Sequence, residues 1–395
     1  MVLASLDVWK TPTRLFFCAA DAPLARPRIR SRTGSATIRY AFFVGLMRDG
    51  RIGGSRFVAC RPPAGWQPGA RAPCSRCMRP LRFGVVAESA RTPDDLLCTA
   101  RLAEDAGCST LLIRDHFIEG PFEHQLAPLT ALTFVAAATS RLRIGTLVID
   151  NDYRHPVVLA KELATLDLLS GGRVEPGFGA GFLRREYEQA GLAFDPPGIR
   201  VSRLAESLPV LKGLLAGEPV TFHGAHYDID GLTSFPPSVQ RPHPPILVAA
   251  AQPRMLAIAA READIVSFQS VSTGGGVVAD PPAGRSPDAL ARQVALVREA
   301  AGARFDQLEQ STTANVVVTD RPREAAEQQI RQRGWDGISA DEVLAMPTMF
   351  LGSRDHMAGL FAERRERFGI SYWILFDGAL PGVAPDLSSL LSAAR

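Results

Sequence analysis

Short apolar runs alternate with amphipathic stretches along residues 81–376. Each run has the length of a β-strand, and its continuous apolar character is typical of strands covered on both faces. In the stretches between the runs, apolar residues recur every three or four positions, as Leu159, Leu163, Leu166 and Leu169 do, which predicts helices with one apolar face. The runs predict strands at 82–87, 109–114, 142–149, 173–177, 246–250, 265–269, 312–318 and 371–376.

Capping residues mark the ends of the predicted helices. Thr92 can cap a helix that has Pro93 in its first turn and that ends at Gly107. Pro156 starts another helix, which Gly171 ends. Further helices are predicted at 129–140, 201–215, 253–262, 287–301 and 354–368 and from residue 321 onward, and a hairpin insertion is predicted at 220–228.

The alternation of strand and helix predicts a parallel sheet, because neighbouring parallel strands need a crossover connection. Eight such units in about 310 residues are typical of a closed (β/α)8 barrel, or TIM barrel, here with insertions. The main alternative, an open doubly wound sheet, has a glycine fingerprint after its first strand, where this chain has residues 87–90 without glycine. The glycines of 177–181 follow the fourth strand, and Phe182 stands where the third fingerprint glycine belongs. We therefore predict an α/β barrel.

Residues 1–77 differ in composition from the rest of the chain. They hold 13 of the 44 Lys and Arg residues but only 3 of the 41 acidic ones. An Arg-rich, acid-poor segment can bind nucleic acid or act as a transit peptide, and Cys74 with Cys77 could be half of a zinc site. Because Met78 directly precedes the first predicted strand, we favour a disordered or mis-assigned N-terminal extension over these alternatives. Residues 78–395 form the predicted barrel domain.

The composition of the barrel domain argues against several classes of partner. Charged residues interrupt every apolar stretch before the roughly 18–20 residues that a membrane-spanning helix needs, so no membrane association is predicted. Cys98 and Cys108 are its only cysteines and belong to one predicted helix and its end, which favours a reducing, cytoplasmic location over a disulfide framework. We expect no nucleic-acid partner, and no metal site because no cluster of His and carboxylate ligands appears.

Active sites of such barrels lie at the carboxyl ends of the strands, and this rule selects candidate residues. His116 follows the second strand and can give or accept a proton near neutral pH, although it could equally bond a loop carbonyl. Residues 249–251 precede a helix start, where small side chains let backbone N–H groups approach a phosphate; close helix–strand packing is the alternative. The same rule selects Asp115, Asn151, Gly179, Ala180 and Gly181.

Several motifs in order resemble those of one family. They are Ile113-Arg-Asp-His-Phe117, Arg143-Ile-Gly-Thr-Leu-Val148, His155-Pro156, Ser170-Gly-Gly-Arg173, Gly177-Phe-Gly-Ala-Gly181 and Pro245-Ile-Leu-Val-Ala-Ala250. Together they look like the luciferase-like monooxygenase superfamily, particularly its actinobacterial branch of oxidoreductases that use coenzyme F420. Each motif is weak alone, but their order across residues 80–378 is specific.

The resemblance implies a deazaflavin, F420, as cofactor and assigns roles to individual positions. His116 matches a histidine near the reactive carbon, as proton donor or acceptor. Leu147 and Val148 match a strand-three bulge whose non-proline cis peptide supports the ring, the 179–181 turn matches a loop beside the cofactor, and 249–251 match its phosphate-binding region. The implied cofactor-binding residues are Glu88, Asp115, Leu147, Val148, Asn151, Gly179, Ala180, Gly181, Ala249, Ala250 and Ala251.

Two positions depart from the family's sugar-phosphate dehydrogenases, which have a Trp where this chain has Gly120 and a catalytic Glu where it has Phe182. We therefore expect hydride transfer between F420 and another, unidentified small organic substrate, whose pocket the insertions at 182–200 and 270–286 would shape. The alternatives are an FMN-dependent monooxygenase supplied by a separate flavin reductase, and a non-catalytic barrel that binds flavin or deazaflavin. The resemblance also implies a homodimer. Pro176 inside the fourth strand has no explanation in the sequence, because proline cannot donate to a strand ladder.

Overall fold

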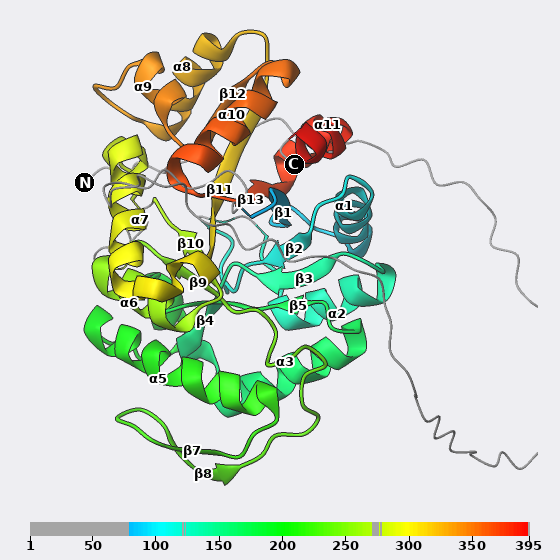
Figure 1. Cartoon of the computed structure of the whole chain (residues 1–395), viewed down its shortest axis with the longest axis vertical. Helices are drawn as coiled ribbons and strands as arrows, with labels where there is room; N and C mark the ends of the chain where they lie inside the picture. The colour runs from blue at the N-terminus through cyan, green and yellow to red at the C-terminus, as the bar shows by residue number, and fades with distance from the viewer. Residues whose placement is uncertain (1–78, 121, 123, 271–275, 277–278, 394–395) are drawn as a thin grey trace, which may run out of the picture. The chain divides into compact units, whose positions relative to one another are not determined.

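The computed structural model describes residues 79–120, 122, 124–270, 276 and 279–393. The predicted N-terminal extension, residues 1–77, lies outside the described residues, as do 271–275 and 277–278 of the predicted insertion at 270–286. All eight predicted barrel strands are present, and helices surround them (Figure 1).

The barrel sheet is parallel and closes on itself. Its hydrogen-bonded strand order is β4-β6-β9-β10-β11-β13-β1-β2-β3-β5. The third predicted strand is divided into β3 and β4 and the fourth into β5 and β6, so the pairs β3–β5 and β4–β6 join the two ends of this order. The strands are β1 (Arg82–Val86), β2 (Thr110–Ile113), β3 (Arg143–Thr146), β4 (Ile149–Asp150), β5 (Val174–Glu175), β6 (Gly177–Gly179), β9 (Leu247–Ala250), β10 (Ile265–Phe268), β11 (Glu309–Val318) and β13 (Tyr372–Phe376).

The side chain of Thr146 joins the third and fourth strands by hydrogen bonds at the point where both are divided. The third strand is interrupted at Leu147 and Val148, whose peptide bond is cis, as the family resemblance implies. The fourth is interrupted at Pro176. Between them the Thr146 hydroxyl donates to the Gly177 carbonyl and accepts from the Gly177 N–H, both at 2.8 Å. Because a hydroxyl replaces the backbone ladder here, a residue without an N–H is tolerated inside the fourth strand.

Helices cover the outside of the barrel, and local signals in the sequence set their starts. The Thr92 side chain accepts from the Asp95 N–H and the Asp95 carboxylate accepts from the Thr92 N–H, which caps the first helix. Outward side chains of the strands and inward side chains of the helices form the main apolar core. The covering helices are α1 (Pro93–Asp105), α2 (Pro128–Ala138), α3 (Pro156–Ser170), α5 (Pro197–Ala216), α6 (Pro253–Glu262), α7 (Pro287–Ala301) and α10 (Arg354–Phe368).

A second apolar cluster fills the inside of the barrel, as alternating side chains of a small barrel do. Its buried members are Val86, Leu112, Leu147, Leu247, Ile265, Tyr372 and Ile374.

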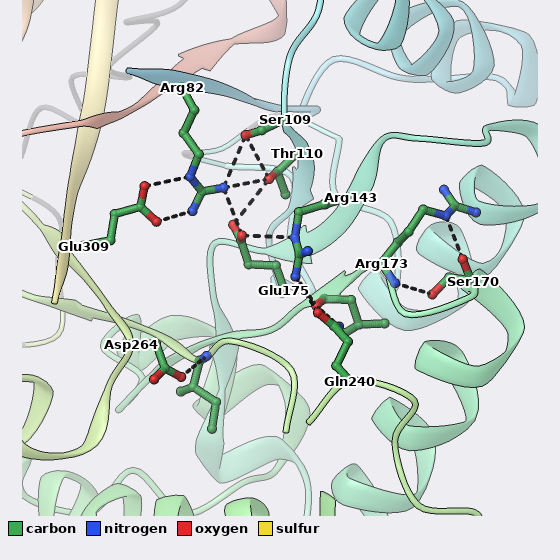
Figure 2. Close-up of polar contacts among 12 residues, drawn as sticks. Arg82, Ser109, Thr110, Arg143, Ser170, Arg173, Glu175, Gln240, Asp264 and Glu309 are labelled. Carbon is green, nitrogen blue, oxygen red and sulfur yellow. Dashed lines mark hydrogen bonds and ion pairs between the residues drawn. The ribbon is translucent and has the colours of Figure 1, made fainter. Parts of the chain in front are cut away.

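A charged network lies at the end of the barrel where the strands begin (Figure 2). Arg82 forms ion pairs with Glu175 at 2.9 Å and with Glu309 at 2.6 Å. Its guanidinium carbon is 3.5 Å from the ring centroid of Tyr372, and Arg143 approaches Glu175 to 3.3 Å. Charges that are paired in this way can be buried at a barrel end. Residues at this end stabilise barrels, whereas ligands bind at the opposite end, where the strands finish; that end is called the open end below.

Several elements lie outside the predicted barrel. β11 continues past its barrel neighbours and pairs with β12 (Met349–Gly352), and α8 (Pro322–Arg333) and α9 (Ala340–Ala345) pack on this extension around Trp335 and Val343. The hairpin of β7 (Val220–His223) and β8 (Asp228–Leu232) is the predicted insertion. The other elements are α4 (Arg184–Ala190), α11 (Leu380–Ala393), η2 (Asn151–Tyr153), η4 (Pro282–Arg285), η5 (Gly302–Gln307) and η6 (Asp377–Ala379). Among the helices described, none has both the length and the apolar character of a membrane span.

Candidate functional site

The open end of the barrel gathers the predicted site residues. Side chains alternate along a strand, so a residue two positions beyond an interior residue again faces the barrel axis. Glu88 lies two positions beyond the interior residue Val86, and Arg114 lies two positions beyond the interior residue Leu112. The other predicted residues follow their strands directly: Asp115 and His116 after β2, Asn151 after β4, Ala180 and Gly181 after β6, and Ala251 after β9.

His116 is held by a carboxylate that the sequence analysis did not select. Its Nδ1 donates to Oε2 of Glu186 in α4 at 2.9 Å, and the Tyr153 hydroxyl donates to the same oxygen at 3.2 Å. The other carboxylate oxygen accepts from the backbone N–H groups of Phe117 at 2.7 Å and Ile118 at 3.3 Å. Because an ionised carboxylate only accepts, the proton lies on Nδ1 and leaves Nε2 for another partner.

Glu186 is buried, with 1% of its side chain exposed. Burial acts to raise its pKa, but the hydrogen bond with His116 and those from the backbone outweigh burial, so the pKa of Glu186 lies below its usual value. The carboxylate is therefore ionised at neutral pH. A negative charge beside Nδ1 can compensate the positive charge that forms on an imidazole during proton transfer.

Aromatic rings surround the imidazole of His116. Phe122 stacks on it with the ring centroids 4.4 Å apart, and Phe182 meets it edge-on at 5.8 Å. As a result 11% of the His116 side chain is exposed. Phe182 occupies the position at which the sugar-phosphate dehydrogenases are expected to have their Glu; in this chain the acid that contacts the histidine is Glu186, four positions later.

Arg114 and Glu88 form an ion pair at the open end, with Nη1 3.0 Å from Oε2. The guanidinium carbon of Arg114 also lies 4.7 Å from the ring centroid of Phe122 and 5.7 Å from that of Phe376. Burial lowers the pKa of Arg114. The carboxylate of Asp377 accepts from the Glu88 N–H at 3.0 Å and so fixes the backbone after β1.

Val148, at the point where the third strand is divided, packs closely against the end of β6, and the turn that follows β6 is also crowded. A Cβ added to Gly179 would lie 2.7 Å from Cγ2 of Val148. Gly181 has a φ of +67°, and a Cβ added to it would lie 1.9 Å from the hydroxyl of Tyr187. Leu147 and Val148 belong to or pack against the interior cluster. The surface that Leu147 and Val148 form is therefore apolar, and position 179, opposite Val148, has room only for glycine.

Buried acids lie behind this turn. Asp150 accepts from the Tyr187 hydroxyl, which lies 2.9 and 2.7 Å from its two oxygens, and burial raises the pKa of Asp150 to about 7. The carboxylate of Asp115 binds Arg154 at 2.5 Å and accepts from the Asp150 N–H at 3.2 Å. Asp115 thus uses its carboxylate to hold neighbouring segments of the protein.

Two features leave polar groups available for a ligand. Asn151 is buried; its Nδ2 donates to the Tyr227 hydroxyl at 3.3 Å, whereas its Oδ1 has no hydrogen-bond partner among the residues that the structure describes. α6 starts at Pro253, and the side chain of its N-cap residue Gln252 makes no hydrogen bond to the helix. The N–H groups at this helix start can therefore donate hydrogen bonds to an anion, which is the setting predicted for a phosphate.

The sequence analysis found His116 but not its partner. Glu186 lies 70 positions away in an insertion, and no regular spacing links the two residues. Within the described parts of the chain, no group of three or more His, Cys, Asp and Glu side chains is arranged to hold a metal ion.

Comparisons with known proteins show the family to which the chain belongs. Residues 80–370 match the family model of luciferase-like monooxygenases. An F420-dependent glucose-6-phosphate dehydrogenase of Microbacterium testaceum is 34% identical over 189 residues, which are 47% of this chain and 55% of that protein. A protein of the same name from Beutenbergia cavernae is 35% identical over 192 residues, again 47% of this chain and 55% of that one. The chain thus spans about half the length of the curated relatives that it matches.

Solved structures share the fold. An F420-dependent secondary alcohol dehydrogenase in complex with an F420–acetone adduct has a TM-score of 0.64 at 17% identity, over 80% of this chain and 100% of that one. A monooxygenase from Streptomyces bottropensis has a TM-score of 0.62 at 23% identity, over 79% and 98%. The barrel prediction is confirmed, and since the family model covers most of the barrel domain, the chain belongs to the luciferase-like monooxygenase family.

Proposed function

We propose that the chain is an F420-dependent oxidoreductase that transfers hydride between the deazaflavin and a small organic substrate. The observation that carries the proposal is the His116–Glu186 pair at the open end of the barrel. When hydride moves to or from a carbonyl carbon, the oxygen gains or loses a proton, and a nearby acid–base group accelerates this step. The names of the relatives at 34 and 35% identity support F420 as the cofactor.

The residues at the open end fit a flat cofactor with an anionic side chain. Leu147 and Val148 would support the ring, with room left by the glycines of the 179–181 turn. The buried Oδ1 of Asn151 would accept a hydrogen bond from the ring, and the uncapped start of α6 after Ala251 would bind a phosphate. Glu88 would approach from β1, while Asp115 acts through the backbone that it holds. In its reduced form the cofactor supplies the hydride.

His116 moves the proton in this proposal. Glu186 keeps a proton on Nδ1, so Nε2 accepts a proton when an alcohol is oxidised and donates it when a carbonyl is reduced. The ionised Glu186 compensates the positive charge of the intermediate imidazolium. Phe122 and Phe182 exclude water from the ring, which strengthens the attraction between the two charges.

The substrate is proposed to differ from a sugar phosphate in the part that lies next to His116. Gly120 and Phe182 replace the Trp and Glu of the sugar-phosphate dehydrogenases. A phenyl ring beside the imidazole offers no hydrogen bond to a sugar hydroxyl and favours an apolar group next to the reacting carbon. Secondary alcohols and ketones with apolar substituents are therefore the first compounds to test.

Spectroscopic titration of the purified chain with F420 and with FMN tests the cofactor. We expect F420 to bind at micromolar concentrations or tighter and FMN to bind more weakly. The opposite order would replace the proposal with a monooxygenase that receives reduced FMN from a separate reductase.

His116→Ala tests the role of the histidine. We expect this variant to keep its affinity for F420 and to lose turnover of any alcohol or ketone that the wild type accepts. His223→Ala, at an exposed hairpin position, is the matched control. Unchanged turnover in His116→Ala would make the histidine structural, and absence of turnover in the wild type across the panel would favour a cofactor-binding barrel.

We further propose a homodimer that forms through α2 and α3. Phe134 on α2 and Val158, Leu168 and Leu169 on α3 are all exposed. Val158 and Leu169 are eleven residues apart and thus lie on one side of the helix. An exposed apolar stripe of this kind is typical of a protein–protein interface. Light scattering should give twice the chain mass of 42.6 kDa, and Leu169→Glu should give the monomer.

A further inference from the structure

Arg200, near the start of α5, is a buried cation, with 5% of the residue exposed, and it forms no ion pair with the residues that the structure describes. Its Nη1 donates to the Gly181 carbonyl at 3.1 Å, and its guanidinium carbon lies 4.1 Å from the ring centroid of Phe194. Burying a cation without an acid is unfavourable, and a hydrogen bond to a carbonyl and a contact with an aromatic ring offset part of this cost. The two contacts therefore indicate what the charge is used for.

The two contacts of Arg200 lie on either side of α4 in the sequence. Gly181 belongs to the turn that leads from β6 into α4, and Phe194 follows the end of α4. The ring of Phe194 in turn meets the ring of Tyr187, inside α4, at a centroid distance of 5.0 Å. Because a peptide group is planar, a fixed Gly181 carbonyl also fixes the peptide that continues into Phe182. Arg200 thus holds the chain before and after the helix.

α4 needs support from outside because it is short and weakly capped. It has 7 residues, whereas isolated helices shorter than about 12 residues are marginal in water. Its N-cap residue, Leu183, makes no side-chain hydrogen bond to the helix. The turn before it has no side chain to add at position 181, since a Cβ there would lie 1.9 Å from the Tyr187 hydroxyl. The position of α4 therefore depends on tertiary contacts.

The stretch between the two contacts carries the groups that orient His116. Glu186 lies in α4 and accepts from Nδ1 of His116 at 2.9 Å. Phe182 lies in the turn before α4 and meets the imidazole edge-on at 5.8 Å. A displacement of α4 would therefore change both contacts at the same time, and Nδ1 would lose the acceptor that keeps its proton.

We propose that Arg200 is a positioning residue for the His116–Glu186 pair. By holding Gly181 and Phe194, it keeps α4 in the place from which Glu186 reaches Nδ1 of the histidine. The part that the pair plays in proton transfer rests on the proposed function, whereas the tautomer of His116 can be measured without cofactor or substrate. The sequence analysis did not select Arg200, because nothing in the spacing of residues 181, 194 and 200 marks them as a group.

Nitrogen-15 NMR of the histidine rings in the full chain, without any ligand, tests the role of Arg200. Arg200→Met keeps a long side chain but loses the donor to Gly181 and the charge over Phe194. We expect the Nε2–H tautomer of His116 to become about tenfold more populated, relative to the Nδ1–H tautomer, than in the wild type; the loss of one hydrogen bond from a charged group can account for a change of this size. His116→Ala identifies the signal by its loss.

Two further variants separate the contacts of Arg200. Arg184→Met is the matched control, because Arg184 also lies over the Phe194 ring, at 4.5 Å, but its side chain is half exposed and makes no hydrogen bond to Gly181. It should keep the wild-type tautomer. Arg200→Lys keeps a charged donor that can reach the Gly181 carbonyl, so its tautomer ratio should lie closer to that of the wild type than the ratio of Arg200→Met does.

The positioning role is wrong if folded Arg200→Met keeps the wild-type tautomer ratio, because a lower melting temperature alone would make Arg200 a structural residue. It is also wrong if Arg184→Met shifts the ratio equally, or if Arg200→Lys behaves like Arg200→Met. If Arg200→Met does not fold, Phe194→Leu decides in its place. This variant removes the aromatic contact and should shift the ratio in the same direction; an unchanged ratio would count against the role.

The tautomer measurement separates this proposal from the proposed function. Failure of the wild type to bind F420 would contradict the proposed function and leave the role of Arg200 standing. An unchanged tautomer in the Arg200 variants, together with F420 binding and turnover by the wild type, would contradict the role of Arg200 alone.

Discussion

Replacing Glu186 with glutamine tests how the carboxylate controls His116. The backbone N–H groups of Phe117 and Ile118 donate to Oε1, so the amide oxygen of glutamine should take that position. The amide nitrogen then faces Nδ1 of His116 and the Tyr153 hydroxyl. Because an amide nitrogen donates and does not accept, His116 has to accept at Nδ1. The proton of the neutral ring therefore moves to Nε2.

Two losses follow from this exchange in Glu186→Gln. Nε2 of the neutral ring no longer accepts a proton, and the negative charge that stabilises the imidazolium is gone. A hydrogen bond to a charged group contributes about 1.5–3 kcal/mol, and each 1.4 kcal/mol changes a rate about tenfold. General acid–base catalysis as a whole contributes about 10²–10⁴-fold. We expect kcat for alcohol oxidation to fall about 100-fold or more. The affinity for F420 should stay within about twofold, since a twofold change corresponds to only about 0.4 kcal/mol.

Nitrogen-15 NMR of the histidine rings measures the tautomer without any substrate. The wild type should show a protonated Nδ1 and an unprotonated Nε2 for His116, and Glu186→Gln should show the reverse. Loss of the signal in His116→Ala assigns it. Tyr153→Phe removes only the 3.2 Å contact with Glu186 and should keep the wild-type tautomer.

The reasoning is wrong if folded Glu186→Gln keeps both the Nδ1 tautomer and the wild-type kcat. It is also wrong if Tyr153→Phe reverses the tautomer, because the hydroxyl and not the carboxylate would then control the ring. A melting temperature close to that of the wild type establishes that the variant is folded.

The remaining predictions concern stability and cofactor binding. Burial raises the pKa of Asp150 to about 7 from 3.8, so the folded chain keeps a proton that the unfolded chain loses, and the free energy of unfolding should fall as the pH rises from about 4 to about 7, by up to about 1.4 kcal/mol per unit. Denaturant unfolding between pH 5 and 7 should show a smaller fall for Asp150→Asn; an equal fall would assign the effect to other groups. Thr146→Val removes the hydroxyl bonded to Gly177 and should lower the free energy of unfolding by about 1–3 kcal/mol, whereas Thr146→Ser should lower it less. Gly179→Ala adds a Cβ at 2.7 Å from Val148 and should weaken F420 binding in the titration described above, and unchanged affinity would remove Val148 from the proposed ring surface.

The barrel was predictable because its strands are continuous apolar runs between capped helices. Each run needs cover on both faces, which a parallel sheet with helices provides, and the absence of a glycine fingerprint after the first strand favoured the closed barrel over an open doubly wound sheet. β12 was missed because it pairs with the part of β11 beyond the barrel and so lies outside the alternation of barrel strands and helices. The divisions of the third and fourth strands were missed because they depend on packing between strands; Pro176 was the visible sign, and its reason appeared only with the Thr146 hydroxyl.

Site residues were predictable from general principles only at the carboxyl ends of the strands, where barrels of this kind have their active sites. The rule of strand ends selected His116, which follows β2, but the orientation of its ring depends on Glu186, which reaches it from α4. Such contacts arise from the tertiary fold, and a single sequence carries no period or spacing that encodes them.

The hydrogen bonds between the Thr146 hydroxyl and Gly177 divide this side of the barrel into two levels. The lower level is the pair β3–β5, and the upper level, at the open end, is the pair β4–β6. In the lower level, β3 pairs with β5, and Glu175 of β5 forms an ion pair with Arg82 that resists distortion. In the upper level, β4 and β6 carry the surface beside Val148, and β6 also pairs with β9. A substitution of Thr146 therefore acts on the wall of the proposed cofactor site as well as on the stability of the barrel.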